Sequence, residues 1–139
     1  MHLRNLWAYL NPPACAQKTR APHRICSAEE FRTILGRERS RSNRNGHGFS
    51  LIAFDVGSPD TASARRLLHM LTRRVRSTDE VGWLDRRCVG VILPYTLPAG
   101  AWKLADDLYQ LMSNEISPPV CTVYTHPFQR SWDGNHHAE

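Results

Sequence analysis

The sequence predicts a mixed α/β (α+β) domain with a ferredoxin-like βαββαβ core, in which helices cover one face of an antiparallel sheet. Short apolar runs bounded by Gly, Pro or Asp alternate with longer segments whose apolar residues recur every three or four positions. Two of these runs are separated only by residues 85–87, which is the length of a hairpin turn. With 139 residues, 41% of them apolar, the chain is long enough for one domain with a buried core.

A helix ahead of this core is predicted over about residues 27–43. It begins with a capping box, because the Ser27 hydroxyl can accept from the backbone N–H of Glu30 while the Glu30 carboxylate reaches back. Asparagine and glycine residues at 43–48 are turn formers and end the helix. The first strand of the core follows at 49–56, as an apolar run with glycine on both sides.

The remaining elements show the same two patterns. Apolar residues at helical spacing predict helices over about 60–75 and 98–113. Strands are predicted at 80–84 and 88–93, on either side of the hairpin turn, and at 120–125 after a pair of prolines. The helices and strands therefore follow one another in the order of the βαββαβ core.

This order has a consequence for two aspartates. The first and third strands of such a core are central antiparallel neighbours, so the end of the first strand lies beside the hairpin that precedes the third. Asp55 ends the first strand and Asp85 lies in the hairpin turn. We therefore expect Asp55 and Asp85 to lie close together.

The composition limits location, partners and domain boundaries. No apolar run approaches the ~20 residues that cross a bilayer, and the N-terminus lacks the features of a signal peptide, so we expect a cytoplasmic chain that does not insert into membranes. The net charge of +5 permits an anionic partner, but no aromatic residues are interleaved with the arginines, so nucleic acid is not an expected partner. We expect an irregular arm at 1–26, one domain at 27–126 and a flexible tail at 127–139.

The segment from Arg76 to Pro94 resembles the region around the signature hairpin of GGDEF domains. It has an RxxD sequence at 76–79 and an apolar strand that ends in Leu-Pro. The run at 49–56 is similar to the first strand of that family, and the resemblance covers about residues 30–125. It implies the βαββαβ core that GGDEF domains share with class III nucleotide cyclases.

In the family that this chain resembles, acidic residues of the first strand and the hairpin hold two divalent ions for cyclisation. Asp55 matches the first of these acids, but Gly57 stands where the second is expected. Residues 85–88, Asp-Arg-Arg-Cys, stand where the family has its glycines and acidic pair. The resemblance therefore implies a degenerate, catalytically inactive GGDEF-like module with a regulatory or interaction role, with no catalytic residues and no cofactor.

Two alternative hypotheses give this chain a ligand-binding function. Asp55 and Asp85 could together hold one Mg²⁺ in an altered nucleotide-binding or nucleotidyl-transfer enzyme. The RxxD sequence resembles the allosteric site for cyclic di-GMP of the wider family, which assigns Arg76 and Asp79 to nucleotide binding. The structural alternative for the second pair is that Asp79 caps a turn.

The hairpin also offers a candidate interaction surface. Trp83, Arg86 and Arg87 would form it if they face solvent, with another protein domain or a second copy of this chain as the partner. Packing within the strand is the alternative for Trp83. The segments TDEVGWLD (78–85) and ILPYT (92–96) also resemble regions ahead of the catalytic part of bacterial sugar transferases in exopolysaccharide synthesis, which suggests an association with that pathway.

Overall fold

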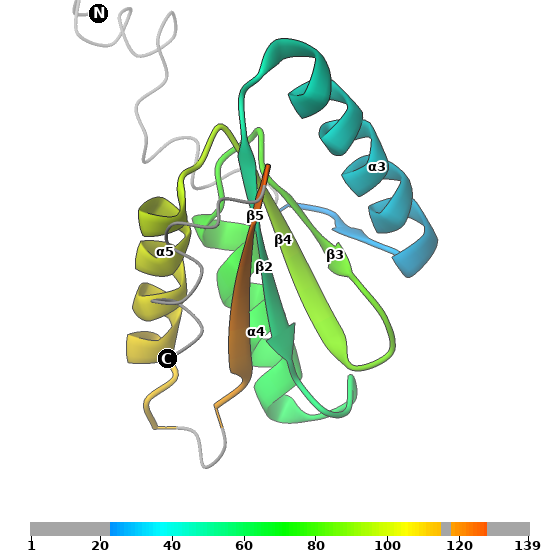
Figure 1. The fold of residues 1–139 in the computed structure, drawn as a ribbon. Helices are drawn as coiled ribbons and strands as arrows, with labels where there is room; N and C mark the ends of the chain where they lie inside the picture. Colours follow the sequence, from blue (N-terminus) through cyan, green and yellow to red (C-terminus); the bar gives the residue numbers. More distant parts are fainter. Residues whose placement is uncertain (1–22, 115–117, 128–139) are drawn as a thin grey trace, which may run out of the picture.

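The computed structural model describes residues 23–114 and 118–127, in which five strands and three helices alternate (Figure 1). In chain order these elements are β1 (Ile25–Cys26), α3 (Ala28–Asn45), β2 (Phe49–Asp55), α4 (Ala62–Arg74), β3 (Glu80–Trp83), β4 (Cys88–Pro94), α5 (Pro98–Leu111) and β5 (Val120–His126). From β2 to β5 the order is βαββαβ, which confirms the predicted fold class. No helix in this part of the chain has both the length and the apolar character to cross a bilayer.

The strands form a single sheet in the order β1-β3-β4-β2-β5. The predicted neighbours, the first and third strands of the core, are β2 and β4, and they pair antiparallel with Asp55 opposite Cys88. The short strand β1 was not predicted: it pairs parallel with β3, with Ile25 opposite Val81. The prediction of an irregular arm up to residue 26 is therefore wrong for these two residues. The rest of the arm, 1–22, and the tail beyond 127 lie outside the described residues.

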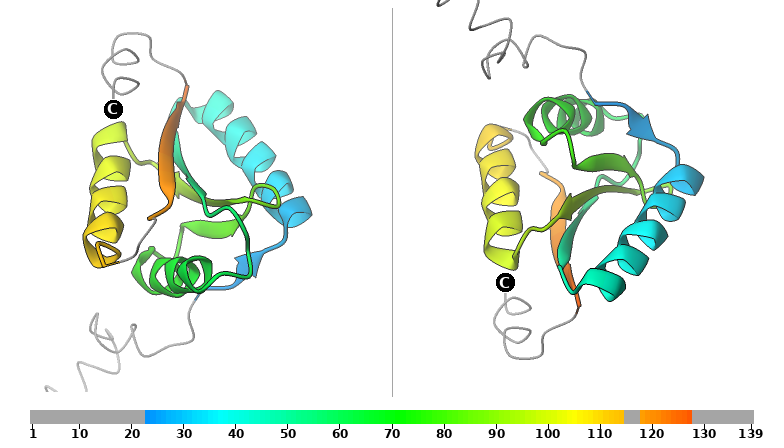
Figure 2. Two further views of the ribbon diagram at one scale, coloured as in Figure 1. Left: turned by 90° about the horizontal axis from the view of Figure 1, so that it is seen from below. Right: turned by 90° about the horizontal axis from the view of Figure 1, so that it is seen from above.

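The helices form layers on both faces of the sheet. Figure 2 shows α4 and α5 on one face, as predicted for the core, and α3 on the other face. The alternation of side chains along β2 serves both layers, since Ile52 and Phe54 are buried under α4 and α5 while Phe49 packs with α3. The sheet is consequently covered on two faces, although the βαββαβ pattern accounts for only one.

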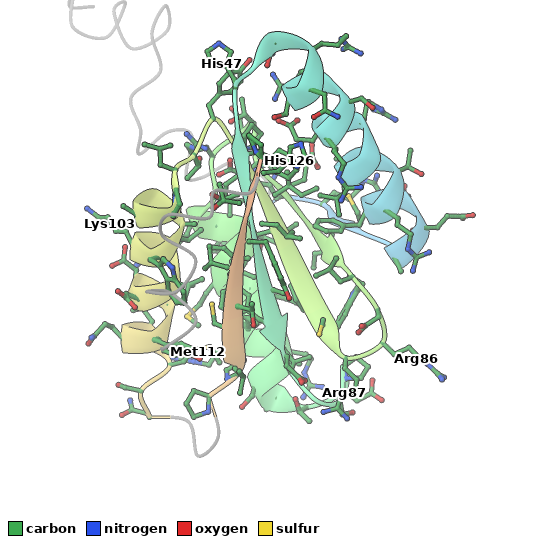
Figure 3. All side chains as sticks on the ribbon, in the orientation of Figure 1. His47, Arg86, Arg87, Lys103, Met112 and His126 are labelled. Carbon is green, nitrogen blue, oxygen red and sulfur yellow. The ribbon has the colours of Figure 1, made fainter. Side chains whose placement is uncertain are left out.

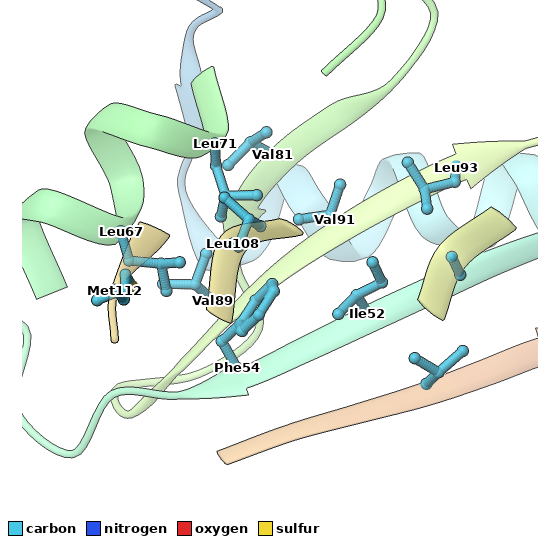
Figure 4. Close-up of a cluster of buried hydrophobic side chains, with 12 residues drawn as sticks. Ile52, Phe54, Leu67, Leu71, Val81, Val89, Val91, Leu93, Leu108 and Met112 are labelled. Carbon is cyan, nitrogen blue, oxygen red and sulfur yellow. The ribbon is translucent and has the colours of Figure 1, made fainter. Parts of the chain in front are cut away.

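The main core lies between the sheet and the two core helices (Figure 4). Its members are buried apolar residues of the four core strands and of the segments that form α4 and α5. They are Ile52, Phe54, Leu67, Leu71, Val81, Val89, Val91, Leu93, Ala101, Leu108, Met112 and Val123. Burial of this apolar surface is the main favourable contribution to folding.

A second, smaller core lies under α3 and depends on two glycines. Gly82 and Gly90 face each other across β3 and β4, and the ring of Phe31 lies over them. A Cβ atom at Gly82 would come within 2.6 Å of the Phe31 ring, and one at Gly90 within 2.7 Å. The absence of these side chains lets α3 approach the sheet closely.

The start of α3 confirms the predicted capping box. The Ser27 hydroxyl accepts from the backbone N–H of Glu30 at 3.2 Å, and the Glu30 carboxylate accepts from the backbone N–H of Ser27 at 3.0 Å. The Arg24 guanidinium also donates to both carboxylate oxygens. Together, Arg24 and the Ser27 amide lower the pKa of Glu30 to about 2. The helix ends at Asn45 and is capped by Gly46, whose φ of 79° is left-handed.

Candidate functional site

The carboxylate of Asp85 stabilises the turn of the hairpin between β3 and β4. Asp85 accepts hydrogen bonds from the backbone N–H groups of Arg87 at 2.8 Å and Cys88 at 2.9 Å, both through Oδ1. These contacts satisfy turn amides that no strand partner reaches. Asp85 therefore has a structural role in the turn, whatever else it binds.

Asp55 lies at the end of β2, beside the same hairpin, as the topology predicted. Its Oδ1 accepts from the backbone N–H of Gly57 at 3.0 Å, and the guanidinium of Arg87 lies 3.5 Å from the same oxygen. The Asp55 and Arg87 side chains are 44% and 66% exposed, so water screens their ion pair. The structure thus places Asp55 beside the hairpin, where its carboxylate forms an ion pair with Arg87.

The acidic groups at this end do not fit a two-ion centre. Within the described ranges, no three or more His, Cys, Asp or Glu residues gather where they could share a metal ion. Asp55 and Asp85 each use one oxygen for backbone amides, and the Arg87 guanidinium opposes a nearby cation. The single Mg²⁺ site at Asp55 and Asp85 stays a prediction.

The predicted interaction surface is only partly exposed. Trp83 is half-buried and packs against the main core, opposite Val89 of β4, which agrees with the strand-packing alternative. Its place on the inward face follows from the alternation of β3, because Val81 two residues earlier is in the core. Arg86 and Arg87 are exposed, and Figure 3 shows them together at the tip of the hairpin. The interaction surface of Trp83, Arg86 and Arg87 stays a prediction.

The predicted nucleotide-binding pair, Arg76 and Asp79, forms a salt bridge in the turn between α4 and β3. Arg76 Nη2 donates to Asp79 Oδ1 at 3.0 Å, and the backbone N–H of Arg76 donates to Oδ2 at 2.8 Å. Asp79 is only 2% exposed. Arg76 Nη2 also donates to the carbonyl of Pro94 at 3.1 Å and the hydroxyl of Thr96 at 2.8 Å. The pair therefore ties this turn to the loop that follows β4.

A pocket of about 400 Å³ opens beside this salt bridge. Arg74 lines it from the end of α4, Arg76 from the turn that follows, and Lys103 and Asp107 from α5. Sequence reasoning missed Lys103, because no local pattern relates a residue of the last helix to the RxxD sequence; only packing of α5 beside α4 brings them together. The pocket offers three cationic side chains and two carboxylates, Asp79 included.

No protein-family model matches the sequence, and no curated protein matches it. Solved structures do. A DGC protein from Thermotoga maritima superimposes with a TM-score of 0.64 at 12% identity, covering 75% of this chain and 83% of that one. The GGDEF domain of DgcB from Caulobacter crescentus, solved with c-di-GMP, gives 0.57 at 12% identity, covering 78% and 73%. The chain has the fold of GGDEF domains.

A further GGDEF-fold neighbour was solved with a protein partner. The diguanylate cyclase SiaD from Pseudomonas aeruginosa, in complex with its activator SiaC, gives a TM-score of 0.54 at 17% identity, covering 97% of this chain and 61% of that one. These likenesses confirm the GGDEF-like fold that the resemblance implied. At these sequence identities, the structural likeness establishes the fold of this chain and does not establish an activity.

Proposed function

We propose that this chain is a catalytically inactive GGDEF-like module with a regulatory or interaction role. The observation that carries the proposal is the ion pair between Arg87 and Asp55. Asp55 is the acid that the resemblance assigns to metal binding, and Arg87 stands at a position where the family has an acidic residue. An arginine of the hairpin thus pairs with the acid that the resemblance assigns to metal binding, which supports the loss of the metal centre.

The physical reason is charge balance. Two divalent ions and a triphosphate need several carboxylates that are free to coordinate. Here one such carboxylate is paired with a guanidinium, the second is replaced by Gly57, and Asp85 supports the turn. Arg86 and Arg87 add positive charge at the hairpin tip, where metal binding would need negatively charged carboxylates.

Incubation of the full chain with GTP and Mg²⁺ or Mn²⁺, followed by chromatography of the nucleotides, tests this proposal. We expect no product above a protein-free control. Product formation that is lost in Asp55→Asn and kept in Asp60→Asn, a matched exposed acid outside the site, would refute it. The same experiment with Asp85→Asn decides whether an altered enzyme uses Asp55 and Asp85 together.

A second candidate function is the binding of cyclic di-GMP at Arg76 and Asp79. The pocket beside the pair favours it, because Arg74, Arg76 and Lys103 can face an anionic ligand there. A ligand that prefers the folded state raises the melting temperature, so the test is a thermal shift with cyclic di-GMP. Lys103→Ala removes a cation without touching the salt bridge and should reduce the shift, whereas Arg73→Ala, on the exposed side of α4, should not. A wild-type chain without a shift would contradict this function.

We also propose that the module acts in the cytoplasm in association with exopolysaccharide sugar transfer. Segments 78–85 and 92–96, whose likeness suggested this link, contain the whole of β3 with the turn residues on either side, and the end of β4 with the start of the loop that follows it. Co-expression with an exopolysaccharide sugar transferase from the organism that encodes this chain should change that enzyme's transfer rate. An unchanged rate with each such transferase of that organism would refute the association.

A further inference from the structure

The two edges of the sheet differ in length. The edge strand β1 has two residues, whereas β5, at the other edge, has seven and pairs with β2 along all of them. In the part of the chain that the structure describes, β5 has a neighbour on one side only. An edge strand of this length presents a row of backbone donors and acceptors that another strand can use.

The hydrogen-bond phase of the sheet identifies which groups face outward. The backbone N–H of Val56 donates to Arg87 and that of Tyr95 to Gly48, so the even-numbered residues of β2 bond to β4. Its odd-numbered residues therefore bond to β5, where Asp55 is opposite Val120. On β5 the inward-bonding residues are Val120, Thr122, Tyr124 and His126. The residues whose backbone groups face outward are Cys121, Val123 and Thr125.

Along Val120–His126 this edge lacks the usual sequence protections, although the Tyr109 side chain of α5 reaches its start, where the hydroxyl donates to the carbonyl of Pro119. Natural edge strands are kept apart by Lys or other charged residues, by Pro, or by bulges. The sequence of β5, VCTVYTH, has no Asp, Glu, Lys, Arg or Pro, and its register with β2 is unbroken. Two large side chains on the face away from α5 are also exposed: Val120 is 68% and Tyr124 is 54% exposed.

We propose that β5 is a dimerisation edge, at which a second copy of this chain adds its own β5 antiparallel about a two-fold axis at Val123. In this register Val123 faces Val123 of the second copy, and Cys121 faces Thr125. The backbone N–H of Cys121 already donates to the Tyr109 hydroxyl. The N–H groups of Val123 and Thr125 each meet a carbonyl of the other copy, which gives about four main-chain hydrogen bonds between the two chains.

The side chains favour a second copy over an unrelated strand. The register sets Tyr124 opposite Thr122 and Val120 opposite His126 of the second copy, which covers both exposed apolar side chains with small or aromatic neighbours. Two chains of net charge +5 repel each other, and the arginines of α3 and α4 concentrate that charge on the helices. The uncharged β5 edge is therefore a place where identical copies can meet without placing like charges in contact.

The β5 pairing supplies a partner for the interaction module proposed above, and it depends on that proposed function in this point only. It is argued from strand geometry, side-chain pairing and charge, and not from the loss of activity. Turnover of GTP would refute the inactive function and leave the pairing standing, and a monomeric chain would refute the pairing and leave the inactivity standing.

Sedimentation of the full chain over a wide concentration range tests the pairing, and we expect a reversible dimer. Thr122→Lys with Tyr124→Lys sets lysine opposite lysine in the proposed register and should weaken the dimer about tenfold or more. Thr122→Lys with Tyr124→Glu sets lysine opposite glutamate and should keep the dimer, with an affinity that falls as salt is added. The matched control, Thr33→Lys with Ser40→Lys on the exposed side of α3, should dimerise as the wild type does.

Amide hydrogen exchange adds a reading at single residues. The outward amides of Val123 and Thr125 should exchange more slowly as concentration rises, while those of Thr122 and Tyr124, already bonded to β2, should not change. Circular dichroism establishes that each variant is folded. A wild-type chain that stays monomeric, a dimer indifferent to the paired lysines, or concentration-dependent protection at another surface would each overturn the proposal.

Discussion

Two of the ion pairs in this molecule join an arginine to an aspartate, and the two aspartates differ in how deeply they are buried. Arg76 meets Asp79, which is almost fully buried, while Arg87 meets Asp55 at the exposed hairpin end. A buried carboxylate that loses its donors costs much more than an exposed one, because water cannot replace them. The Arg76 pair should therefore contribute to stability, and the Arg87 pair should mainly set the charge of the site.

Substitution of these arginines tests that difference. We expect Arg76→Ala to lower the free energy of unfolding by about 1–3 kcal/mol, since Asp79 keeps only a backbone donor. Arg87→Ala should cost less than about 1 kcal/mol, as exposed ion pairs do. Arg73→Ala, an exposed arginine of the same region, should stay within about 0.5 kcal/mol of the wild type. Urea denaturation measures all three, and equal effects of Arg76→Ala and Arg73→Ala would contradict the structural role of the pair.

At the scale of elements, α3 can lie close to the sheet because Gly82 and Gly90 have no Cβ atoms. The Phe31 ring occupies the space that two Cβ atoms would otherwise fill. A packed interior tolerates added volume poorly, because neighbouring side chains must leave their preferred rotamers or the backbone must shift. The helix position is consequently sensitive to a single methyl group on the strand.

Gly90→Ala should lower the free energy of unfolding by about 1–3 kcal/mol through this clash. Combining it with Phe31→Leu, which removes part of the ring, should cost less than the sum of the two single changes. Gly36→Ala is the matched control, because a Cβ at this exposed position in α3 meets nothing within 4 Å. It should stabilise the chain by up to about 1 kcal/mol, as alanine does in helices. Additive effects of Phe31→Leu and Gly90→Ala in denaturation experiments would contradict the close packing.

At the scale of the whole molecule, β2 is the strand around which the layers are built. It pairs with β4 and β5 along its full length, and its side chains enter both cores. Strand β1, in contrast, has two residues, with one strand partner. Regions with few buried contacts open locally, and the most enclosed strands open only when the whole domain unfolds.

Native-state hydrogen exchange should therefore resolve a gradient across the sheet. The amides of Ile52 and Phe54 should exchange only through global unfolding, with a free energy equal to that from denaturation. The β1 amides should exchange through small local openings that barely respond to denaturant. An amide of β1 that is as protected as Ile52 would show that the N-terminal strand is part of the main cooperative unit.

Much of this architecture could be predicted from the residues alone. Apolar spacing predicted α4, α5 and the four strands of the core, because period and burial are linked in each element. The capping box at Ser27 predicted the start of α3. The antiparallel pairing of β2 with β4 followed from the βαββαβ pattern, and with it the place of Asp55 beside the hairpin.

Other features were decided by tertiary structure. The two residues of β1 are too few to show a period, and pairing with β3 alone makes them a strand. Trp83 is packed because β3 turns that side toward the core, and Lys103 joins Arg76 because α5 lies beside α4. Periodicity tells which side of a segment is apolar. Which neighbour covers that side depends on contacts between residues far apart in the chain, and these exist only once the layers have packed.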